Sequence, residues 1–373
     1  MNKHVSYLLN EFFIKIFGTP VYHPRFWLDE RDKLPYTQNL SRLHRWKTLL
    51  KGFNSDKLFV YRFDKNDRKL FVNDIRRRIL CERISKKYYY LVHDKVVFHK
   101  YFFGVVELTP RVGLLNNGGM ILIAPPSSSG MSRANGGDAS VSVRSLVRDV
   151  INDECYFLKP LDGGSGKGIL KVESRFGKLL VNGIVSDEDR LCKQLASLNG
   201  YLVERRLPQS GFSNRIYPDA LNTLRIMTMI DPQSGNPFIP VALHRFGTTK
   251  SGHADNWSRG GLSVWIDIAS GTLGKGVQYP FDGKLKFLSE HPDTKIEFEG
   301  YQIQNWKEVV SEVLKAASFV PFLPYVGWDV VLTGDQVLFQ EANYNPDLNL
   351  IQVHRPLLSD TAVRRFYEHH GVV

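Results

Sequence analysis

The stretch that decides the fold is Cys155-Tyr-Phe-Leu-Lys-Pro-Leu-Asp-Gly-Gly-Ser-Gly-Lys-Gly-Ile-Leu-Lys171. An apolar run at 156–158 precedes Lys159, and a second run at 169–172 follows a glycine-rich segment. The sequence therefore predicts two strands joined by a flexible loop. Glycines let a backbone approach a polyphosphate closely and turn its N–H groups toward it. The pattern is typical of a nucleotide-binding flap, although an ordinary hairpin with a flexible tip has the same pattern.

Two better-known phosphate loops do not fit this stretch. A P-loop requires Gly, four residues and then Gly-Lys-Ser/Thr before a helix, but here Leu161 holds the first position and Gly168 the last. A dinucleotide-binding fingerprint opens a helix, whereas this loop opens the aliphatic run at 169–172. We therefore expect the loop to lie over phosphates as a flap between two strands.

The composition indicates a globular protein from a reducing compartment. The chain of 373 residues is 43% apolar and 23% charged, and its length predicts two or three domains. Cys81, Cys155 and Cys192 are far apart and form no CxxC pair, so neither a zinc knuckle nor a disulfide framework is indicated. We find no apolar run of transmembrane length and no signal-peptide pattern. We expect a cytoplasmic protein, with peripheral attachment to a membrane left open.

Positive charge is concentrated in the first quarter of the chain. Residues 1–100 hold 22 Lys and Arg against 10 Asp and Glu, and residues 101–373 hold 27 against 28. The charge is densest at 76–78, with Arg83, Lys86 and Lys87 close behind. Such a face attracts an anionic membrane surface or a phosphate-bearing glycan precursor. A solvated face without a partner is the alternative, and nucleic acid is not expected because no recognised nucleic-acid module appears.

The remaining pattern gives a coarse layout. Residues 5–17 carry an apolar stripe at helical spacing, which predicts a helix docked on its own domain or lying on a membrane surface. Residues 104–124 are strand-like, and residues 125–140 form a polar loop. Further helices are expected at 38–52, 72–87, 141–151, 187–198 and 304–318.

The C-terminal part contains a candidate metal site on a hairpin. Gly334-Asp335 marks the turn, and Glu341 and Asn343 share one strand face by the two-residue period. A three-residue loop places Asp329 opposite Glu341, whereas a two-residue loop shifts the register by one, so the pairing stays open. Two carboxylates about 4 Å apart repel by roughly 4 kcal/mol at an effective dielectric near 20. Mg²⁺, which takes hard oxygen ligands, would remove that cost, and an exposed hairpin with scattered polar groups is the alternative.

These pieces together resemble the ATP-grasp superfamily, in particular the sugar-transfer-associated ATP-grasp proteins. The resemblance covers about residues 90–370 and rests on the order of several motifs. They are Asp94-Lys95, Leu158-Lys159-Pro160 with the loop 162–168, Tyr201-Leu-Val-Glu204, Asn222-Thr-Leu-Arg225, the stretch 253–261, Trp328-Asp329 and Glu341-Ala-Asn343-Tyr-Asn345-Pro346. It implies an α+β ATP-grasp fold, in which two α+β subdomains sandwich ATP. The implied domains are a basic, mainly helical region at 1–103, a lid subdomain with the flap at 104–205, and a subdomain with the metal and acceptor site at 206–373.

The resemblance also implies roles for individual residues. Lys95 and Lys159 would hold the phosphates of ATP, and Glu204 would line the adenine pocket. The flap that closes over the phosphates would comprise Gly163, Gly164, Ser165, Gly166, Lys167 and Gly168. The ligands of Mg²⁺ would be Asp329, Glu341 and Asn343, and the catalytic residues would be Arg225, Asn256 and Arg259. One departure is Gly327, because D-alanine–D-alanine ligase-like members place an arginine two residues before the first metal-binding Asp. Arg225 or Arg259 is expected to supply that charge.

By resemblance, the chain is expected to be an ATP-dependent carboxylate–amine ligase that works through an acyl phosphate. The family name points to polysaccharide or glycoconjugate biosynthesis, with small-molecule or glycan-linked carboxylate and amine substrates. Glycan-assembly proteins are a further candidate partner of the basic N-terminal region. His244, His253 and His354 are candidates for the base toward the amine or for structural roles. Phosphotransfer to a hydroxyl and a nucleotide-binding regulatory module are the alternative functions.

Overall fold

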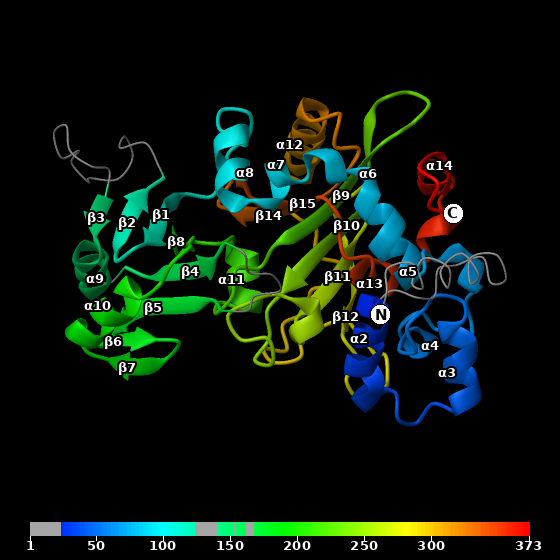
Figure 1. Ribbon diagram of the computed structural model, residues 1–373, viewed down its shortest axis with the longest axis horizontal. Helices are drawn as coiled ribbons and strands as arrows, with labels where there is room; N and C mark the ends of the chain where they lie inside the picture. The colour runs from blue at the N-terminus through cyan, green and yellow to red at the C-terminus, as the bar shows by residue number, and fades with distance from the viewer. Residues whose placement is uncertain (1–23, 124–139, 153, 162–167) are drawn as a thin grey trace, which may run out of the picture.

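The computed structural model describes residues 24–123, 140–152, 154–161 and 168–373. It is an α+β structure with two antiparallel sheets side by side, each with its own helices (Figure 1). The predicted helix at 5–17, nearly all of the polar loop at 125–140 and the flap residues 162–167 lie outside the described part. Within the described part, no helix is long and apolar enough to cross a membrane.

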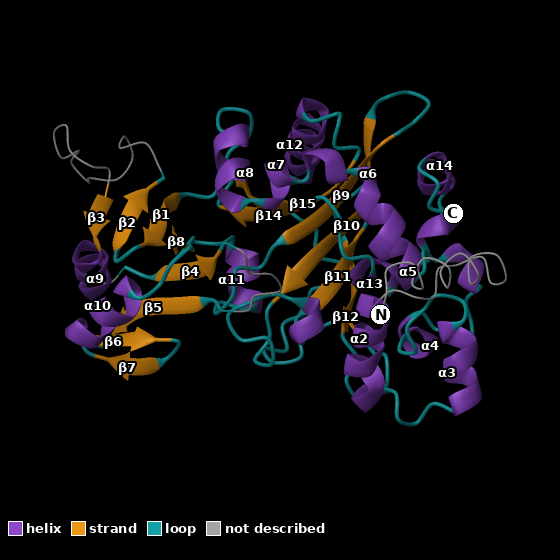
Figure 2. Ribbon diagram, viewed as in Figure 1, coloured by secondary structure: helices purple, strands orange, loops and turns teal. Residues whose placement is uncertain are grey.

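The smaller lobe holds an eight-stranded sheet in the order β3-β2-β1-β8-β4-β5-β6-β7 (Figure 2). Its strands are β1 (Arg111–Asn116), β2 (Gly119–Leu122), β3 (Ser140–Ser142), β4 (Tyr156–Pro160), β5 (Leu170–Arg175), β6 (Lys178–Val181), β7 (Ile184–Ser186) and β8 (Tyr201–Arg205). Helices α9 (Val143–Ile151) and α10 (Glu188–Ala196) pack their apolar sides, including Leu146 and Leu191, onto this sheet. The two strands predicted on either side of the glycine loop are confirmed as the antiparallel pair β4 and β5.

The larger lobe holds a seven-stranded sheet in the order β13-β12-β11-β10-β9-β14-β15. Its strands are β9 (Leu224–Ile230), β10 (Pro237–Phe246), β11 (Leu262–Ile266), β12 (Leu273–Gln278), β13 (Phe287–Leu288), β14 (Tyr325–Thr333) and β15 (Gln336–Asn343). The central strands are buried on both faces, which explains their nearly continuous apolar sequences. One face is covered by α8 (Lys95–Phe102) and α12 (Trp306–Phe319).

The other face of the larger sheet is covered by the N-terminal region together with the C-terminal helices. The N-terminal elements on this side are α2 (Pro24–Lys33), α3 (Arg42–Leu49), α4 (Lys57–Val60), α5 (Asp74–Arg76), a π turn (Arg77–Cys81) and α6 (Glu82–Ile84). Helix α7 (Tyr90–His93) packs instead with α8 on the first face, where Val92 joins the same core. The C-terminal ones are α13 (Asn349–Gln352) and α14 (Thr361–His369), and a short α11 (Gly211–Ile216) follows the smaller lobe. Figure 1 shows the N-terminal helices beside the C-terminus of the chain.

One hydrophobic core joins the N-terminal region to the larger sheet. Phe53, Tyr61 and Phe71 pack in the same cluster as Met227 and Met229 of β9. Asn73 is the N-cap of α5, because its side chain accepts a hydrogen bond from the Arg76 amide at 2.8 Å. The basic region therefore packs as part of the larger lobe, while the boundaries at 103 and 205 stay predictions.

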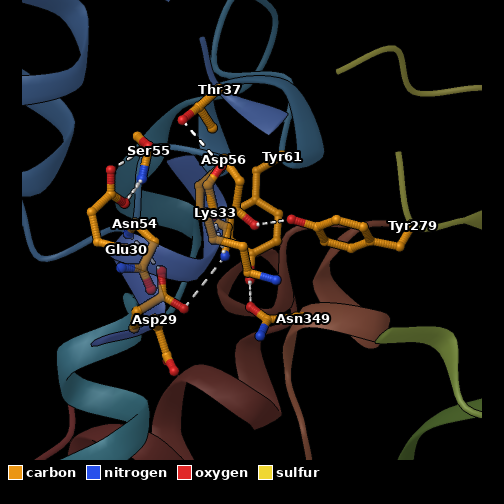
Figure 3. A network of polar contacts seen from close by, with 12 residues as sticks. Asp29, Glu30, Lys33, Thr37, Asn54, Ser55, Asp56, Tyr61, Tyr279 and Asn349 are labelled. Carbon is orange, nitrogen blue, oxygen red and sulfur yellow. Dashed lines mark hydrogen bonds and ion pairs between the residues drawn. The ribbon is translucent and has the colours of Figure 1, made fainter. Parts of the chain in front are cut away.

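Buried polar contacts fix this packing (Figure 3). Lys57 is almost fully buried, with its Nζ 2.8 Å from Asp56 and 3.6 Å from Asp74. Tyr279 follows β12 directly, and its hydroxyl donates to the other Asp56 oxygen at 3.0 Å. The Tyr61 hydroxyl donates to the side chain of Asn349 at 3.0 Å. Because these groups are shielded from water, each bond lost leaves a costly unpaired partner.

Tyr279→Phe is expected to lower the free energy of unfolding by about 1.5–3 kcal/mol, because it leaves the buried Asp56 carboxylate one donor short. The measurement is urea unfolding of the purified variant. Tyr36→Phe is the control, because it removes the same atom from the half-buried ring that packs edge-on against Tyr279. Equal losses in the two variants would contradict a special role for the Tyr279–Asp56 bond.

Candidate functional site

A cavity of about 450 Å³ lies where the two sheets meet. Its wall contains eight of the residues that the sequence predicted for a nucleotide and metal site. These are Lys95, Lys159, Glu204, Arg225, Asn256, Asp329, Glu341 and Asn343. Residues that are more than 200 positions apart in the chain therefore face one space.

The smaller lobe contributes a buried cluster of charges to the cavity. Glu204 of β8 accepts a hydrogen bond from Lys159 of β4 at 2.5 Å, and its other oxygen lies 3.5 Å from Arg111. Burial alone would raise the pKa of the Glu204 carboxyl, but the Lys159 and Arg111 cations outweigh burial and lower it. Lys95 begins α8 behind the N-cap Asp94, and its Nζ lies 3.5 Å from the Leu161 carbonyl oxygen. Both lysines are thus held beside the point where the flap starts.

The larger lobe contributes the hairpin of β14 and β15, and its register resolves the alternative left open by the sequence. The turn has two residues, since Thr333 pairs with Gln336. The register then shifts between Val330 and Asp329, so that Asp329 faces Glu341 after all. This β-bulge leaves Gln340 without a partner residue in the ladder, and the Gln340 carbonyl accepts a hydrogen bond from Arg111 at 2.6 Å.

Two arginines hold Asp329 from the neighbouring strands. Arg225 of β9 lies directly opposite and donates to both Asp329 oxygens through Nε and Nη2, the latter at 2.9 Å. Arg245 of β10 donates to Asp329 at 3.0 Å and lies 3.3 Å from Asp255. Although burial opposes it, these cations hold the pKa of Asp329 far below its usual range. Burial and the Asp329 charge instead raise the pKa of Glu341.

The family model of sugar-transfer-associated ATP-grasp proteins matches residues 78–362, which is most of the chain. The chain belongs to this family. The predicted ATP-grasp fold is therefore confirmed, while the role of the smaller lobe as its lid stays a prediction. A search of curated proteins finds no match to the chain.

Solved structures with a similar fold include three ATP-grasp enzymes from bacteria. Biotin carboxylase from Campylobacter jejuni has a TM-score of 0.39 and 12% identity, over 75% of this chain and 46% of its own. D-alanyl-alanine synthetase A from Vibrio cholerae has a TM-score of 0.37 and 13% identity, over 75% and 60%. A RiPP-associated ATP-grasp ligase from Chryseobacterium gregarium, solved with ADP and a leader and core peptide, has a TM-score of 0.38 and 10% identity, over 81% and 70%. The chain spans only 46% and 60% of the length of the first two relatives found.

The residues of this ATP-grasp cavity fit Mg²⁺ through oxygen ligands. In the described part of the chain, no three His, Cys, Asp or Glu side chains cluster as a ready metal site. The raised pKa of Glu341 shows that a negative charge there is costly beside Asp329. The buried Oδ1 of Asn345 has no hydrogen-bond partner among the described atoms. Glu341, Asn343 and Asn345 would therefore offer ligands next to Asp329, with phosphate oxygens completing the shell. The assignment of Asp329, Glu341 and Asn343 stays a prediction.

Some predicted residues lie elsewhere. Arg259 is exposed at the end of a short helical turn (Trp257–Arg259) and does not belong to the described wall of the cavity. Gly168 has a φ of +74° and lies next to Pro160 and Tyr201. It does not belong to the described wall of the main cavity. Gly163, Gly164, Ser165, Gly166 and Lys167 lie outside the described residues.

Gly327 shows why Arg225 suits the role that the sequence left open. A Cβ at Gly327 would lie 3.5 Å from Cδ of Arg225 and 3.0 Å from the Pro346 ring. The Pro346 ring and the Arg225 side chain from β9 therefore fill the space in front of Gly327, and Arg225 lies beside Asp329. This placement favours Arg225 over Arg259 as the cation of the site.

Sequence reasoning missed Arg245 and Arg111. Arg245 follows a nearly continuous apolar run in β10, and a charge in such a buried strand signals an ion partner. Asp255, the second carboxylate beside Arg245, is held in place by Thr223. The Thr223 amide and hydroxyl both donate to Asp255, at 3.0 and 2.5 Å. Arg111 is the first residue of β1, and an arginine at the start of a strand is usually exposed. The sequence around it therefore contains no sign that this side chain is buried beside Glu204.

The three candidate histidines differ in position. His253 lines the cavity, and its Nδ1 lies 3.1 Å from the Asp219 carbonyl oxygen. His354 is half-buried and contacts the Ser263 hydroxyl of β11 at 3.0 Å, and the buried His244 contacts Ser213 at 3.3 Å. Burial lowers the pKa of both His244 and His354 to about 3. Neither lies in the wall of the main cavity, so structural roles fit them better.

This burial predicts a loss of stability in acid. A histidine whose folded pKa is about 3, below its unfolded value of about 6.5, stabilises the fold fully above pH 6.5 and loses that contribution as the pH falls. His354 should therefore cost about 2 kcal/mol of unfolding free energy between pH 7 and pH 5.

His354→Asn should flatten this pH dependence, because the amide stays neutral and can still bond to Ser263. Urea unfolding at pH 7 and pH 5 measures the effect. The exposed His369→Asn serves as the control and should keep the slope of the unchanged protein. The same slope in both variants would show that His354 titrates normally.

Proposed function

We propose that this chain is an ATP-dependent ligase that joins a carboxylate to an amine and works in the assembly of a polysaccharide or glycoconjugate. The observation that supports it is the main cavity, where Lys95 and Lys159 face Glu341 and Asn343 across one space. Its two sides carry the opposite charges that a polyphosphate with Mg²⁺ requires. The role in glycan assembly rests on the name of the family alone.

In the proposed first step, a carboxylate oxygen of the substrate attacks the γ-phosphorus of ATP, and ADP leaves. Lys95 and Lys159 bind the phosphates, so that nucleotide binding competes with the Lys159–Glu204 contact. Arg225 keeps positive charge beside the transferred phosphoryl group while Asp329 holds its guanidinium in place. When bound, Mg²⁺ supplies further stabilisation of charge on the phosphate oxygens.

In the second step, the amine attacks the acyl carbon, phosphate leaves and the amine gives up a proton. His253 is the candidate acceptor among the three histidines, because it alone of them lines the described cavity. Its Nδ1 must donate to the Asp219 carbonyl, which leaves Nε2 able to take the proton.

The test is a mass-spectrometric screen of carboxylate and amine pools with ATP and Mg²⁺. An amide together with ADP and phosphate is the expected product set. A phosphate ester with ADP and no free phosphate would replace the ligase by a kinase. ATP that binds but is not consumed with any pool would favour a regulatory module. Lys159→Ala should largely abolish ATP binding and is the control for the site.

A further inference from the structure

A second, polar cavity of about 200 Å³ adjoins the main one. His93, Asn343 and Asn345 belong to the walls of both cavities. The rest of the second wall consists of Arg77, Arg78, Glu82 and Tyr344. The space equals the liquid volume of about seven waters, which is enough for a small anionic group.

Buried polar atoms without partners are concentrated in this wall. Among the described residues, Nε of Arg77, Nδ2 of Asn343 and Oδ1 of Asn345 are buried and have no hydrogen-bond partner. A buried polar atom is normally paired. Because Oδ1 of Asn345 is a candidate ligand of Mg²⁺ in the main cavity, the atoms that indicate a missing ligand or ordered water here are those of Arg77 and Asn343. The first two atoms are donors, and arginine can only donate. The missing partner must therefore offer acceptor atoms to them.

The charged groups around the cavity leave room for such a partner. Arg77 lies 3.4 Å from Asp347 and 3.7 Å from Asp74, both longer than the usual 2.7–2.9 Å of a charge-assisted bond. Arg78 pairs with Asp29, and Glu82 pairs with Lys86. The wall itself thus contains two cations and one anion, and the anion is already bound to a lysine.

The backbone explains why these arginines face inward. Residues Arg77–Cys81 form a π turn between α5 and α6, and such turns are rare and frequent at functional sites. The Arg77 and Arg78 side chains are only 13% and 21% exposed, whereas Arg83 of the same basic run is exposed. Two of the charges that the sequence placed on an outer basic face therefore lie in the wall of the second cavity.

We propose that the second cavity binds a phosphate or carboxylate group of the substrate that reacts in the main cavity. The reacting substrate would then carry a second anionic group, held by Arg77 and Arg78 on the far side of Asn343 and Asn345. That the anion belongs to a substrate rests on the proposed function, whereas anion binding by the cavity does not. The small volume and the shared wall favour a soluble substrate over a lipid headgroup of the same chemistry.

The test uses inorganic phosphate as the probe, titrated by calorimetry at constant ionic strength. One series uses the protein saturated with Mg²⁺ and a non-hydrolysable ATP analogue, so that the main phosphate site is filled, and a second series omits the nucleotide. Arg78→Gln should weaken phosphate binding by about tenfold or more, the effect of one hydrogen bond to a charged group. Arg83→Gln is the matched control, because it removes the same charge from the exposed part of the run. Its phosphate affinity should stay within about twofold of that of the unchanged protein.

Arg78→Lys keeps the charge and the pairing with Asp29 but loses the planar fork, so it should weaken binding severalfold even if Arg78→Gln does not fold. Equal phosphate affinity in the Arg78 variants and the unchanged protein would overturn the proposal, as would no phosphate binding at all, which would leave ordered water in the cavity. Binding only to vesicles of anionic lipid, lost in Arg83→Gln, would place the anion site on the outer surface and also overturn it. Failure of ligation with phosphate binding intact would count against the proposed function alone.

Discussion

Glu341→Gln is expected to fold and bind ATP, while substrate-dependent ADP release falls by at least about a hundredfold. Burial and the facing Asp329 already raise the pKa of Glu341, so a neutral amide of the same shape suits the fold without metal. The same amide cannot supply the negative charge that holds a divalent cation against the phosphates. The loss should therefore appear in turnover rather than in nucleotide binding.

The measurement is ADP release by the purified variant, with circular dichroism as the folding control and an ATP analogue titration beside it. Glu308→Gln makes the same exchange at an exposed position of α12 and should keep normal turnover. Near-normal turnover in a folded Glu341→Gln protein would sink the metal assignment.

The hairpin shows how far local pattern determines the structure. Its turn, its two strands and the shared face of Glu341 and Asn343 follow from alternation and from Gly334-Asp335. The bulge at Gln340 does not follow from them, because its carbonyl is bound by Arg111, which lies 229 residues earlier in the chain. A contact of that range leaves no local signal, so the pairing of Asp329 with Glu341 required the structure.

The charged residues show the same limit. A count of charges predicts an outer basic face around residues 76–78, yet tertiary packing turns Arg77 and Arg78 toward a cavity. Likewise, the excess of positive charge made residues 1–103 look separate from the rest. Phe53, Tyr61 and Phe71 of this region nevertheless share a core with β9, a contact that composition cannot reveal.

Asp329 and Glu341 look equivalent in sequence, but Asp329→Asn is expected to behave differently from Glu341→Gln. It should lower the free energy of unfolding by about 3–5 kcal/mol, because Arg225 and Arg245 would keep buried charges without their carboxylate. Urea unfolding measures this loss. Asp335→Asn, at the exposed tip of the same hairpin, should change stability by less than about 0.5 kcal/mol. Equal stability of the two variants would contradict the buried ion network.

A second substitution separates the cost of unpaired charge from the loss of a contact. In the Asp329→Asn background, Arg245→Met removes one stranded cation, so the combined loss should be smaller than the sum of the single losses. Arg245 also lies 3.3 Å from Asp255, but burial raises the pKa of that carboxyl, which can take up a proton when its cation is removed. A strictly additive double variant would mean that Asp329 stabilises the sheet through packing. A less-than-additive one would show that Asp329 stabilises the fold by compensating the buried charges of Arg225 and Arg245.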